Sequence, residues 1–295
     1  MFASPHTGPP ADSDVAIRLG IHGCGHYCHG GKLFGRVAVD EMSLTKRALL
    51  KTSRELASAP DLVRAIQIYR RYRDFTMIAP KLYVNNLMLC RNNAPPVGSI
   101  VEAGVWRGGM SAGIADMLPG RIHYLFDSFA GLPPAKEIDG HSALWWQSHP
   151  EVQGGLDNCR AERQFAELAM GRSKAKEFHL IEGWFQDTLA SFAPSDPIAV
   201  LRLDGDWYDS TMQCLEALYP HLLPGGLIII DDYYAWDGCA RAVHDYLSIH
   251  KSVDRIDSWR NICYIIKRSS ESGGKLAQTG SSSDHFRTPA VSTTA

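Results

Sequence analysis

Two apolar segments that each end in a pair of aspartates are the most informative feature of this 295-residue chain. The first, VLRLDGD, ends with Asp204 and Asp206, and the second, LIIIDD, ends with Asp231 and Asp232. The residues between them read as a helix closed by Pro224-Gly225-Gly226, so we expect two neighbouring parallel strands whose carboxyl ends meet at one sheet edge. Four carboxylates crowded there repel one another unless a proton or a cation intervenes. A hard divalent cation with oxygen ligands is the economical explanation.

Each of these aspartates also has a simpler interpretation. A single Asp after an apolar run is usually a helix cap or a turn residue. Two pairs at two strand ends are harder to explain in that way. The segment LIIIDD also fits the second motif of nucleotide triphosphatases, but the chain holds no G-x-x-x-x-G-K-[ST] sequence, so that class of enzyme is not expected.

A glycine-rich turn follows an upstream strand candidate, Ser99–Ala103, and leads into a helix. Such a turn lets the backbone approach a ligand closely. The next strand ends at Asp127, where an acidic residue commonly accepts hydrogen bonds from ribose hydroxyls. Gly104 and Gly108 are separated by three residues, so the turn is not the G-x-G-x-x-G of dinucleotide-binding folds. Glu102 is unexpected beside a pyrophosphate but suits a cofactor that carries a sulfonium and an ammonium group.

Between about residues 73 and 267 the chain resembles the macrocin O-methyltransferase family, whose members are S-adenosylmethionine-dependent and metal-dependent. They methylate sugar hydroxyls on macrolide and aminocoumarin antibiotics. The motifs that carry the resemblance are RDFTM (Arg73–Met77), VEAGVWRGG (Val101–Gly109), LFDSFAGLP (Leu125–Pro133), EGWFQDTL (Glu182–Leu189), LRLDGDWYDST (Leu201–Thr211) and IIDDYYAWDGCARAV (Ile229–Val243). The resemblance implies an α/β class I methyltransferase fold, which is Rossmann-like: a seven-stranded sheet with the last strand antiparallel, helices on both faces and an N-terminal helical cap.

The resemblance also implies a set of site residues and two cofactors, S-adenosylmethionine and Mg²⁺. Asp204, Asp231 and Asp232 match the metal ligands of the family, and Asp206 matches its general base. The residues expected at the methyl donor are Thr76, Met77, Glu102, Gly104, Gly108, Ser111 and Asp127, together with Trp184, which we expect against the adenine.

A long insertion, Asp139–Leu156, is expected to act as a lid, because long loops of this kind are often functional. It carries Trp145 and Trp146, for which we expect a surface that meets the sugar or an apolar aglycone. Packing in the core is the competing interpretation for every aromatic residue near the site.

The strand candidates alternate with helical stretches, which favours a parallel sheet. Only Ser258–Asn261 joins the last two, so that pair is expected to be antiparallel. The predicted strands are Ser99–Ala103, Ile122–Asp127, Phe178–Glu182, Ala199–Leu203, Leu227–Asp231, Val253–Asp257 and Ile262–Lys267. Helices are predicted at Met42–Ser58, Asp61–Arg73 and Pro80–Arg91. In the second of these, Leu62, Ile66 and Tyr69 share one face and are expected to pack.

We expect one methyltransferase domain over residues 42–268, between a flexible leader (1–41) and a disordered tail (269–295). The net charge of −2 gives no electrostatic reason to expect nucleic acid or a membrane as a partner. No apolar run approaches the roughly 20 residues that span a bilayer. The N-terminal residues lack the features of a secretory signal, so the expected location is the cytoplasm.

The seven cysteines are odd in number and scattered, which argues against a disulfide framework. Five of the residues between His22 and His29 are His or Cys, and they leave two interpretations open: a zinc site, or part of a mobile leader without the usual spacing of a zinc finger.

The function expected is methyl transfer to a sugar hydroxyl of a glycosylated small molecule. One alternative is a metal-dependent O-methyltransferase of a catechol-like phenol, since the same carboxylates would serve vicinal phenolic hydroxyls. The other is a relative of the same fold that binds nucleotide or metal without methylating anything. The sequence leaves open the sugar, the aglycone, the position methylated and whether the chain forms a homo-oligomer.

Overall fold

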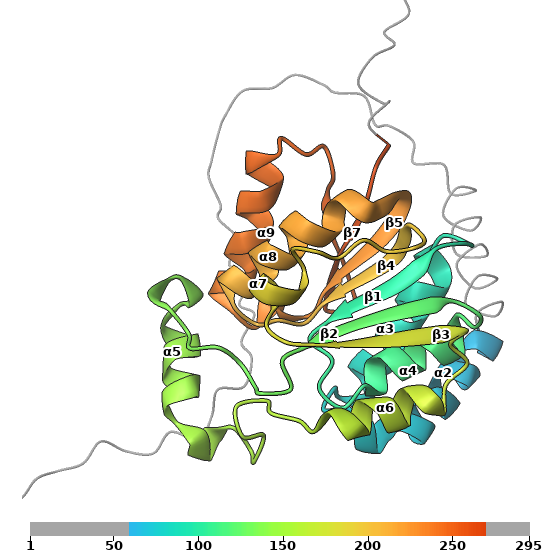
Figure 1. Ribbon diagram of the computed structural model, residues 1–295, viewed down its shortest axis with the longest axis horizontal. Coiled ribbons are helices and arrows are strands. Elements are labelled where there is room, and N and C mark those ends of the chain that lie inside the picture. Colours follow the sequence, from blue (N-terminus) through green and yellow to red (C-terminus); the bar gives the residue numbers. More distant parts are fainter. Residues whose placement is uncertain (1–58, 270–295) are drawn as a thin grey trace, which may run out of the picture. The chain divides into compact units, whose positions relative to one another are not determined.

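The structure is a computed structural model that describes residues 59–269. In this part of the chain, seven strands form a single mixed sheet. Their order across the sheet is β3-β2-β1-β4-β5-β7-β6 (Figure 1). Strands β1 to β5 pair in parallel, and β7 is antiparallel to both of its neighbours, β5 and β6. The antiparallel pairing of β6 with β7 is the one that the sequence predicts. The strands are β1 (Ser99–Ala103), β2 (Ile122–Asp127), β3 (Glu177–Glu182), β4 (Ile198–Leu203), β5 (Leu222–Ile230), β6 (Ile256–Trp259) and β7 (Ile262–Ile266).

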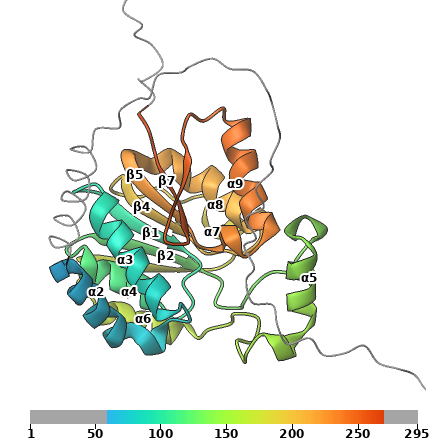
Figure 2. The same cartoon turned by 180° about the vertical axis from the view of Figure 1, so that it is seen from behind.

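Helices cover both faces of the sheet, so each face has its own apolar core (Figures 1 and 2). One face carries α2 (Ala59–Tyr72), α3 (Pro80–Asn93), α4 (Gly109–Met117) and α6 (Arg163–Gly171). The other face carries α7 (Phe185–Thr188), α8 (Tyr208–Leu218) and α9 (Asp237–Ile249). Helix α5 (His141–Ser148) belongs to the predicted lid insertion and stands apart from both layers in the two views. None of the described helices is long and apolar enough to cross a membrane.

The apolar content of each strand follows how deeply the strand is buried in the sheet. β1 and β4 lie in the middle of the sheet and are buried along their whole length, so they read as nearly continuous apolar runs. Edge strand β3 is covered less completely and alternates between exposed and half-buried residues. Two charged residues interrupt the buried strands, Glu102 in β1 and Arg202 in β4, and they are paired across the sheet.

Helix α2 packs through a face that is rotated from the one predicted. Of the three predicted residues, Tyr69 packs against the core, but Leu62 and Ile66 are exposed, and Ala65, Ile68 and Tyr72 are buried instead. Polar contacts to α4 fix the orientation of α2 about its own axis. The guanidinium of Arg71 and the hydroxyl of Tyr72 both donate to the buried carboxylate of Asp116, at 2.9 and 3.2 Å. Apolar periodicity alone does not contain this information.

Two predicted strand boundaries were also wrong. β6 runs from Ile256 to Trp259, because Arg260 and Asn261 alone make the turn to β7, both with left-handed φ values of 50° and 66°. β5 begins at Leu222, so Pro224-Gly225-Gly226 lies inside a strand and does not close helix α8. The predicted leader, the helix at 42–58, the His/Cys segment and the predicted tail beyond Ser269 lie outside the described residues.

Candidate active site

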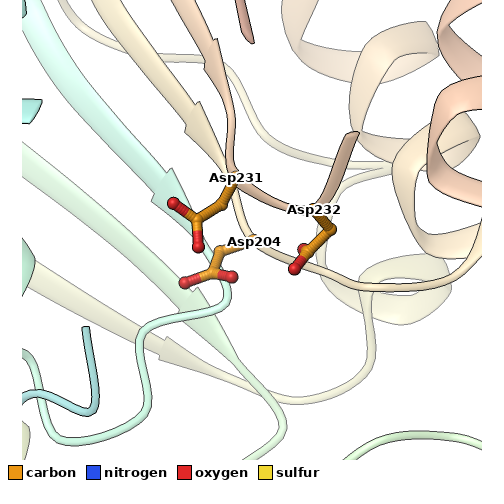
Figure 3. A group of neighbouring side chains, drawn as sticks. All are labelled: Asp204, Asp231 and Asp232. Carbon is orange, nitrogen blue, oxygen red and sulfur yellow. The ribbon is translucent and has the colours of Figure 1, made fainter. Parts of the chain in front are cut away.

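The aspartates of the two predicted strand ends lie together at the carboxyl edge of the sheet. Asp204 follows β4 directly, and β5 gives way to a 3₁₀ turn, η5 (Asp231–Tyr234), at Asp231. One carboxylate oxygen from each of Asp204, Asp231 and Asp232 lies within 4.8 Å of the others (Figure 3). The backbone turn at Asp231 lets two consecutive residues face one point, which an extended strand would not allow.

Asp206 lies beside this cluster but is not part of it. β4 ends at Leu203, and Asp206 has a left-handed φ of 57°, so the spacing of residues 204 and 206 is not that of an extended strand. Its backbone N–H donates to Oδ2 of Asp232 at 3.0 Å, and its Oδ1 accepts a hydrogen bond from the indole Nε1 of Trp236 at 2.8 Å.

Arg202 is the counter-charge of the carboxylate cluster. Its side chain is only 1% exposed, and its Nη1 lies 2.7 Å from Glu102 Oε1 and 2.6 Å from Asp204 Oδ2. Its Nη2 forms an ion pair of 2.6 Å with Asp231 Oδ1. Arg202 thus links the end of β1 to the ends of β4 and β5. The second oxygen of Asp204 and of Asp231 stays outside these contacts.

Burial and mutual repulsion raise the pKa values of the acidic groups. Burial, then the charge of Asp204, raises the pKa of Asp206 to about 8. Burial raises the pKa of Asp231 to about 6 against the opposing effect of Arg202. The pKa of Asp232 is raised well above its usual range, first by burial and then by the charge of Asp206. One guanidinium therefore does not compensate this group of carboxylates, and additional positive charge would stabilise it.

The glycine-rich turn brings β1 and β4 into close contact. Gly104 has a φ of 89°, and a Cβ there would overlap the carbonyl oxygen of Asp204. Gly108, the N-cap residue of α4, has a left-handed φ of 78°, and a Cβ would lie 2.9 Å from Cα of Ala166. The hydroxyl of Ser111 donates to Glu102 Oε2. Gly108 and Ser111 do not line the cleft described below, so their positions favour supporting roles behind its wall.

Glu102 and Asp127 both face this turn but differ in their partners. Burial raises the pKa of Glu102 to about 7, although Arg202 and Ser111 stabilise its charge. Asp127 accepts three backbone hydrogen bonds, from Val105 and Trp106 at its Oδ2 (2.6 and 2.8 Å) and from Phe129 at its Oδ1 (2.7 Å). Asp127 therefore organises the turn itself and keeps part of the acceptor capacity of Oδ1 for a ligand.

A cleft of about 420 Å³ runs along this edge of the sheet and contains most of the predicted site residues. The lining residues at its glycine-turn end are Thr76, Met77, Glu102, Gly104, Asp127 and Trp184, and those at its carboxylate end are Asp204, Asp206, Asp231 and Asp232. Lys136, Gln186 and Gln213 also line the cleft, together with apolar residues such as Leu132 and Trp207. The cleft thus joins two chemically different compartments.

Hydrogen bonds at two points, Asp139 and Gln147, tie the insertion that carries α5 to the elements around the cleft. Asp139 accepts a hydrogen bond from the backbone N–H of Tyr208 at 2.7 Å, at the start of α8. Gln147 donates to Asn158 Oδ1 at 3.0 Å, and the side-chain amide of Asn158 donates to the Leu132 carbonyl at 2.8 Å. The loop that follows β2 is thereby held against the insertion.

Three features of the site were not predicted from the sequence: the buried Arg202, the hydrogen bond from Trp236 to Asp206, and Cys159 in the cleft wall. An arginine inside the apolar run VLRLD was a usable signal, because Arg is rarely buried without a charged partner. The other two depend on contacts across the fold. Cys159 and the four other cysteines within residues 59–269 are free thiols.

A family model described as Macrocin-O-methyltransferase (TylF) matches residues 74–265, more than half of the chain. The Streptomyces olivaceus protein named 8-demethyl-8-(2,3-dimethoxy-alpha-L-rhamnosyl)-tetracenomycin-C 4'-O-methyltransferase is 38% identical over 178 residues, which are 56% of this chain and 66% of that protein. The Mycinamicin III 3''-O-methyltransferase of Micromonospora griseorubida is 34% identical over 194 residues, 61% of this chain and 73% of that protein. The matched part thus spans about two thirds of the first of these relatives (66%).

Similarity extends to a solved structure. The structure of the O-methyltransferase NovP aligns with a TM-score of 0.52 and 30% sequence identity, over 66% of this chain and 83% of that one. The fold of the aligned part is therefore shared with a protein described as an O-methyltransferase.

Proposed function

The chain belongs to the macrocin O-methyltransferase family and has the class I methyltransferase fold, and from this we infer that it is an S-adenosylmethionine-dependent O-methyltransferase of a sugar hydroxyl on a glycosylated natural product. We propose further that the reaction needs a divalent cation, Mg²⁺. The observation that carries the proposal is the cleft, in which a glycine-turn compartment adjoins a carboxylate cluster. Both curated relatives described above are named for methylation of a natural product, and one name includes a rhamnosyl group.

The glycine-turn end of the cleft fits S-adenosylmethionine, the methyl donor. Gly104 lets the backbone of the turn come close to a ligand, Asp127 keeps acceptor capacity for a ribose hydroxyl, and Trp184 offers a ring for the adenine. Met77 is 44% exposed at the rim, where it would cover the bound cofactor. When bound, the cofactor supplies an electrophilic methyl group on a positively charged sulfur.

The carboxylate end fits a hard divalent cation. Asp204, Asp231 and Asp232 are an all-oxygen ligand set of the kind that Mg²⁺ prefers, and Arg202 leaves the second oxygen of Asp204 and of Asp231 available. Such an ion would orient vicinal hydroxyls and lower the pKa of the one to be methylated.

Asp206 is left as the carboxylate that takes the proton from the acceptor hydroxyl. It lines the cleft next to the three proposed ligands without belonging to their cluster. Loss of that proton makes the sugar oxygen a competent nucleophile toward the methyl carbon. Gln186 and Gln213, which also line the cleft, could form hydrogen bonds with an acceptor that has several hydroxyl groups.

A screen of glycosylated acceptors with isotopically labelled S-adenosylmethionine and Mg²⁺ tests the function. The expected product is a glycoside with one additional methyl ether on a sugar carbon, identified by mass and NMR. Methylation of catechols but not of glycosides would contradict the sugar assignment. Absence of cofactor binding in calorimetry would contradict the methyltransferase assignment.

A further inference from the structure

Trp236 lies directly behind the proposed base. Its indole Nε1–H donates to Oδ1 of Asp206 at 2.8 Å. Trp236 is not among the residues that line the cleft, whereas Asp206 is. Trp236 therefore acts on the cleft through its neighbours, and Asp206 is the one to which its indole donates a hydrogen bond.

The backbone of Asp206 is already held, but its carboxylate needs a further contact. The left-handed φ of 57° and the bond from its N–H to Asp232 fix the direction in which the side chain leaves the backbone. Rotation of the carboxylate about its own bonds remains free. The indole hydrogen bond restrains this rotation by holding Oδ1, and within residues 59–269 no hydrogen bond to Oδ2 is seen.

Trp236 is itself held on three sides. Its backbone N–H donates to the carbonyl of Asp232 at 3.0 Å, immediately before α9. Its ring meets that of Trp207 edge-on, with 5.3 Å between the ring centroids. On the side of the lid insertion, the ring of Trp146 in α5 lies 5.9 Å away in a tilted arrangement. The donor that reaches Asp206 thus belongs to a packed aromatic group that includes the lid helix.

We propose that Trp236 is a positioning residue that aims Oδ2 of Asp206 at the acceptor hydroxyl, and that the contact with Trp146 makes this alignment depend on the seating of α5. The inference rests on the proposed function, because it takes Asp206 as the group that receives the acceptor's proton. That proton passes from the acceptor oxygen to Oδ2, and the indole keeps its own proton throughout. Trp236 stabilises one orientation of the carboxylate without touching the substrate.

The hydrogen bond can be tested without any acceptor. In protein labelled with ¹⁵N-tryptophan, the Trp236→Phe variant assigns one indole resonance among the seven tryptophans. We expect Asp206→Ala to shift this resonance upfield and to speed its exchange with solvent at least tenfold, with a smaller change in Asp206→Asn. The resonance of Trp259, in β6 at the far edge of the sheet, is the internal control. A Trp236 resonance that does not respond to either change at Asp206 would overturn the proposal.

Kinetics then test the positioning role. Trp236→Phe keeps a ring but loses the donor, so we expect kcat to fall roughly 10- to 100-fold, as for other small misplacements of reacting groups. The acceptor KM and the calorimetric Kd for the cofactor should stay within about twofold of wild type, since neither depends on proton transfer. Trp146→Ala should give a smaller fall in kcat and a partial shift of the Trp236 resonance.

The matched control is Trp259→Phe, which loses an indole donor far from the cleft and should keep wild-type kinetics. A kcat of Trp236→Phe equal to that of this control would overturn the positioning role. Weaker cofactor binding, a higher acceptor KM and a lower kcat in the same variant would also overturn it, because that pattern indicates a general structural defect. A wild-type enzyme that binds cofactor but methylates no glycoside would instead overturn the proposed function, and the indole resonance would still decide whether Trp236 holds Asp206.

Discussion

Arg202 is the residue on which the carboxylate cluster most depends. It is fully buried and contacts acidic side chains at the ends of three strands. Burial alone would lower the pKa of its guanidinium, but Asp204, Asp231 and Glu102 raise it well above its usual value. A buried ion pair of this kind contributes little net stability over an apolar pair, whereas removing one partner leaves uncompensated charge in the interior.

Replacing Arg202 should therefore destabilise the protein strongly. We expect Arg202→Met to lower the free energy of unfolding by about 3–5 kcal/mol in urea denaturation. Arg202→Lys should lose less stability than Arg202→Met, because lysine keeps the positive charge. It should still be less stable than wild type, because lysine lacks the planar guanidinium. The control is Arg163→Met, which breaks only the exposed ion pairs to Glu167 and Glu182 and should cost at most about 1 kcal/mol. Equal stability of Arg202→Met and the control would contradict this role.

The two aspartates of the first strand end should behave differently when mutated. Asp204→Asn removes a proposed cation ligand, so we expect weaker Mg²⁺ binding and lower turnover, partly recovered at high Mg²⁺. Asp206→Asn should keep the calorimetric affinities for Mg²⁺ and cofactor while turnover falls by roughly 10²–10⁴, the usual contribution of a general base. Rescue of Asp206→Asn by excess Mg²⁺ would show that the two roles are misassigned.

The aspartates of the site could be located from the sequence because a parallel strand ends where its apolar run ends. Their partners could not. The contact of Arg202 with Glu102 depends on the pairing of β1 with β4, and that of Trp236 with Asp206 joins residues 30 positions apart. Asp127 shows the same limit, since its location was predicted but not the three backbone N–H groups that donate to it.

Among the elements, the contact between α2 and α4 depends on polar groups as much as on apolar ones. The strand interiors were predictable from continuous apolar runs, and β1 and β2 have the predicted bounds. The face through which α2 packs was not predictable, because the polar contacts of Asp116 determine it. This side chain is 4% exposed and accepts hydrogen bonds from Arg71, Tyr72 and the backbone N–H of Lys174. It thus ties α2 and the segment before β3 to α4.

Removal of the Asp116 carboxylate should loosen α2. We expect Asp116→Ala to lower the free energy of unfolding by about 2–4 kcal/mol, because the buried hydroxyl of Tyr72 and the N–H of Lys174 lose their acceptor. Hydrogen exchange should accelerate first in α2. Asp61→Ala breaks the more exposed pair with Arg91 and serves as the control, with an expected loss below about 1 kcal/mol. An Asp116→Ala variant as stable as this control would contradict the role.

For the whole molecule, the order of the strands joins the two ends of the cleft. β1 lies between β2 and β4, so the glycine turn after β1 faces Asp127 on one side and Asp204 on the other. The sequence indicated an alternating α/β chain of seven strands with an antiparallel end, and the family resemblance implied that they form a single sheet. That β7 inserts between β5 and β6 did not follow from the residues, because hairpin length determines which strands are antiparallel but not which of them is at the edge.

Binding at both ends of the cleft should appear as stability of the whole domain. A ligand at 100 times its Kd adds about 2.7 kcal/mol, which corresponds to a rise in Tm of roughly 5–10 °C for a domain of this size. We expect S-adenosylhomocysteine to give such a rise, whereas NAD⁺ and ATP should give none. Mg²⁺ should raise the Tm of EDTA-treated protein because it neutralises carboxylates that burial and repulsion destabilise. The double variant Asp231→Asn/Asp232→Asn should lose the response to Mg²⁺ and keep the response to S-adenosylhomocysteine. Full turnover after exhaustive chelation, or an unchanged Mg²⁺ response in that variant, would contradict the cation site.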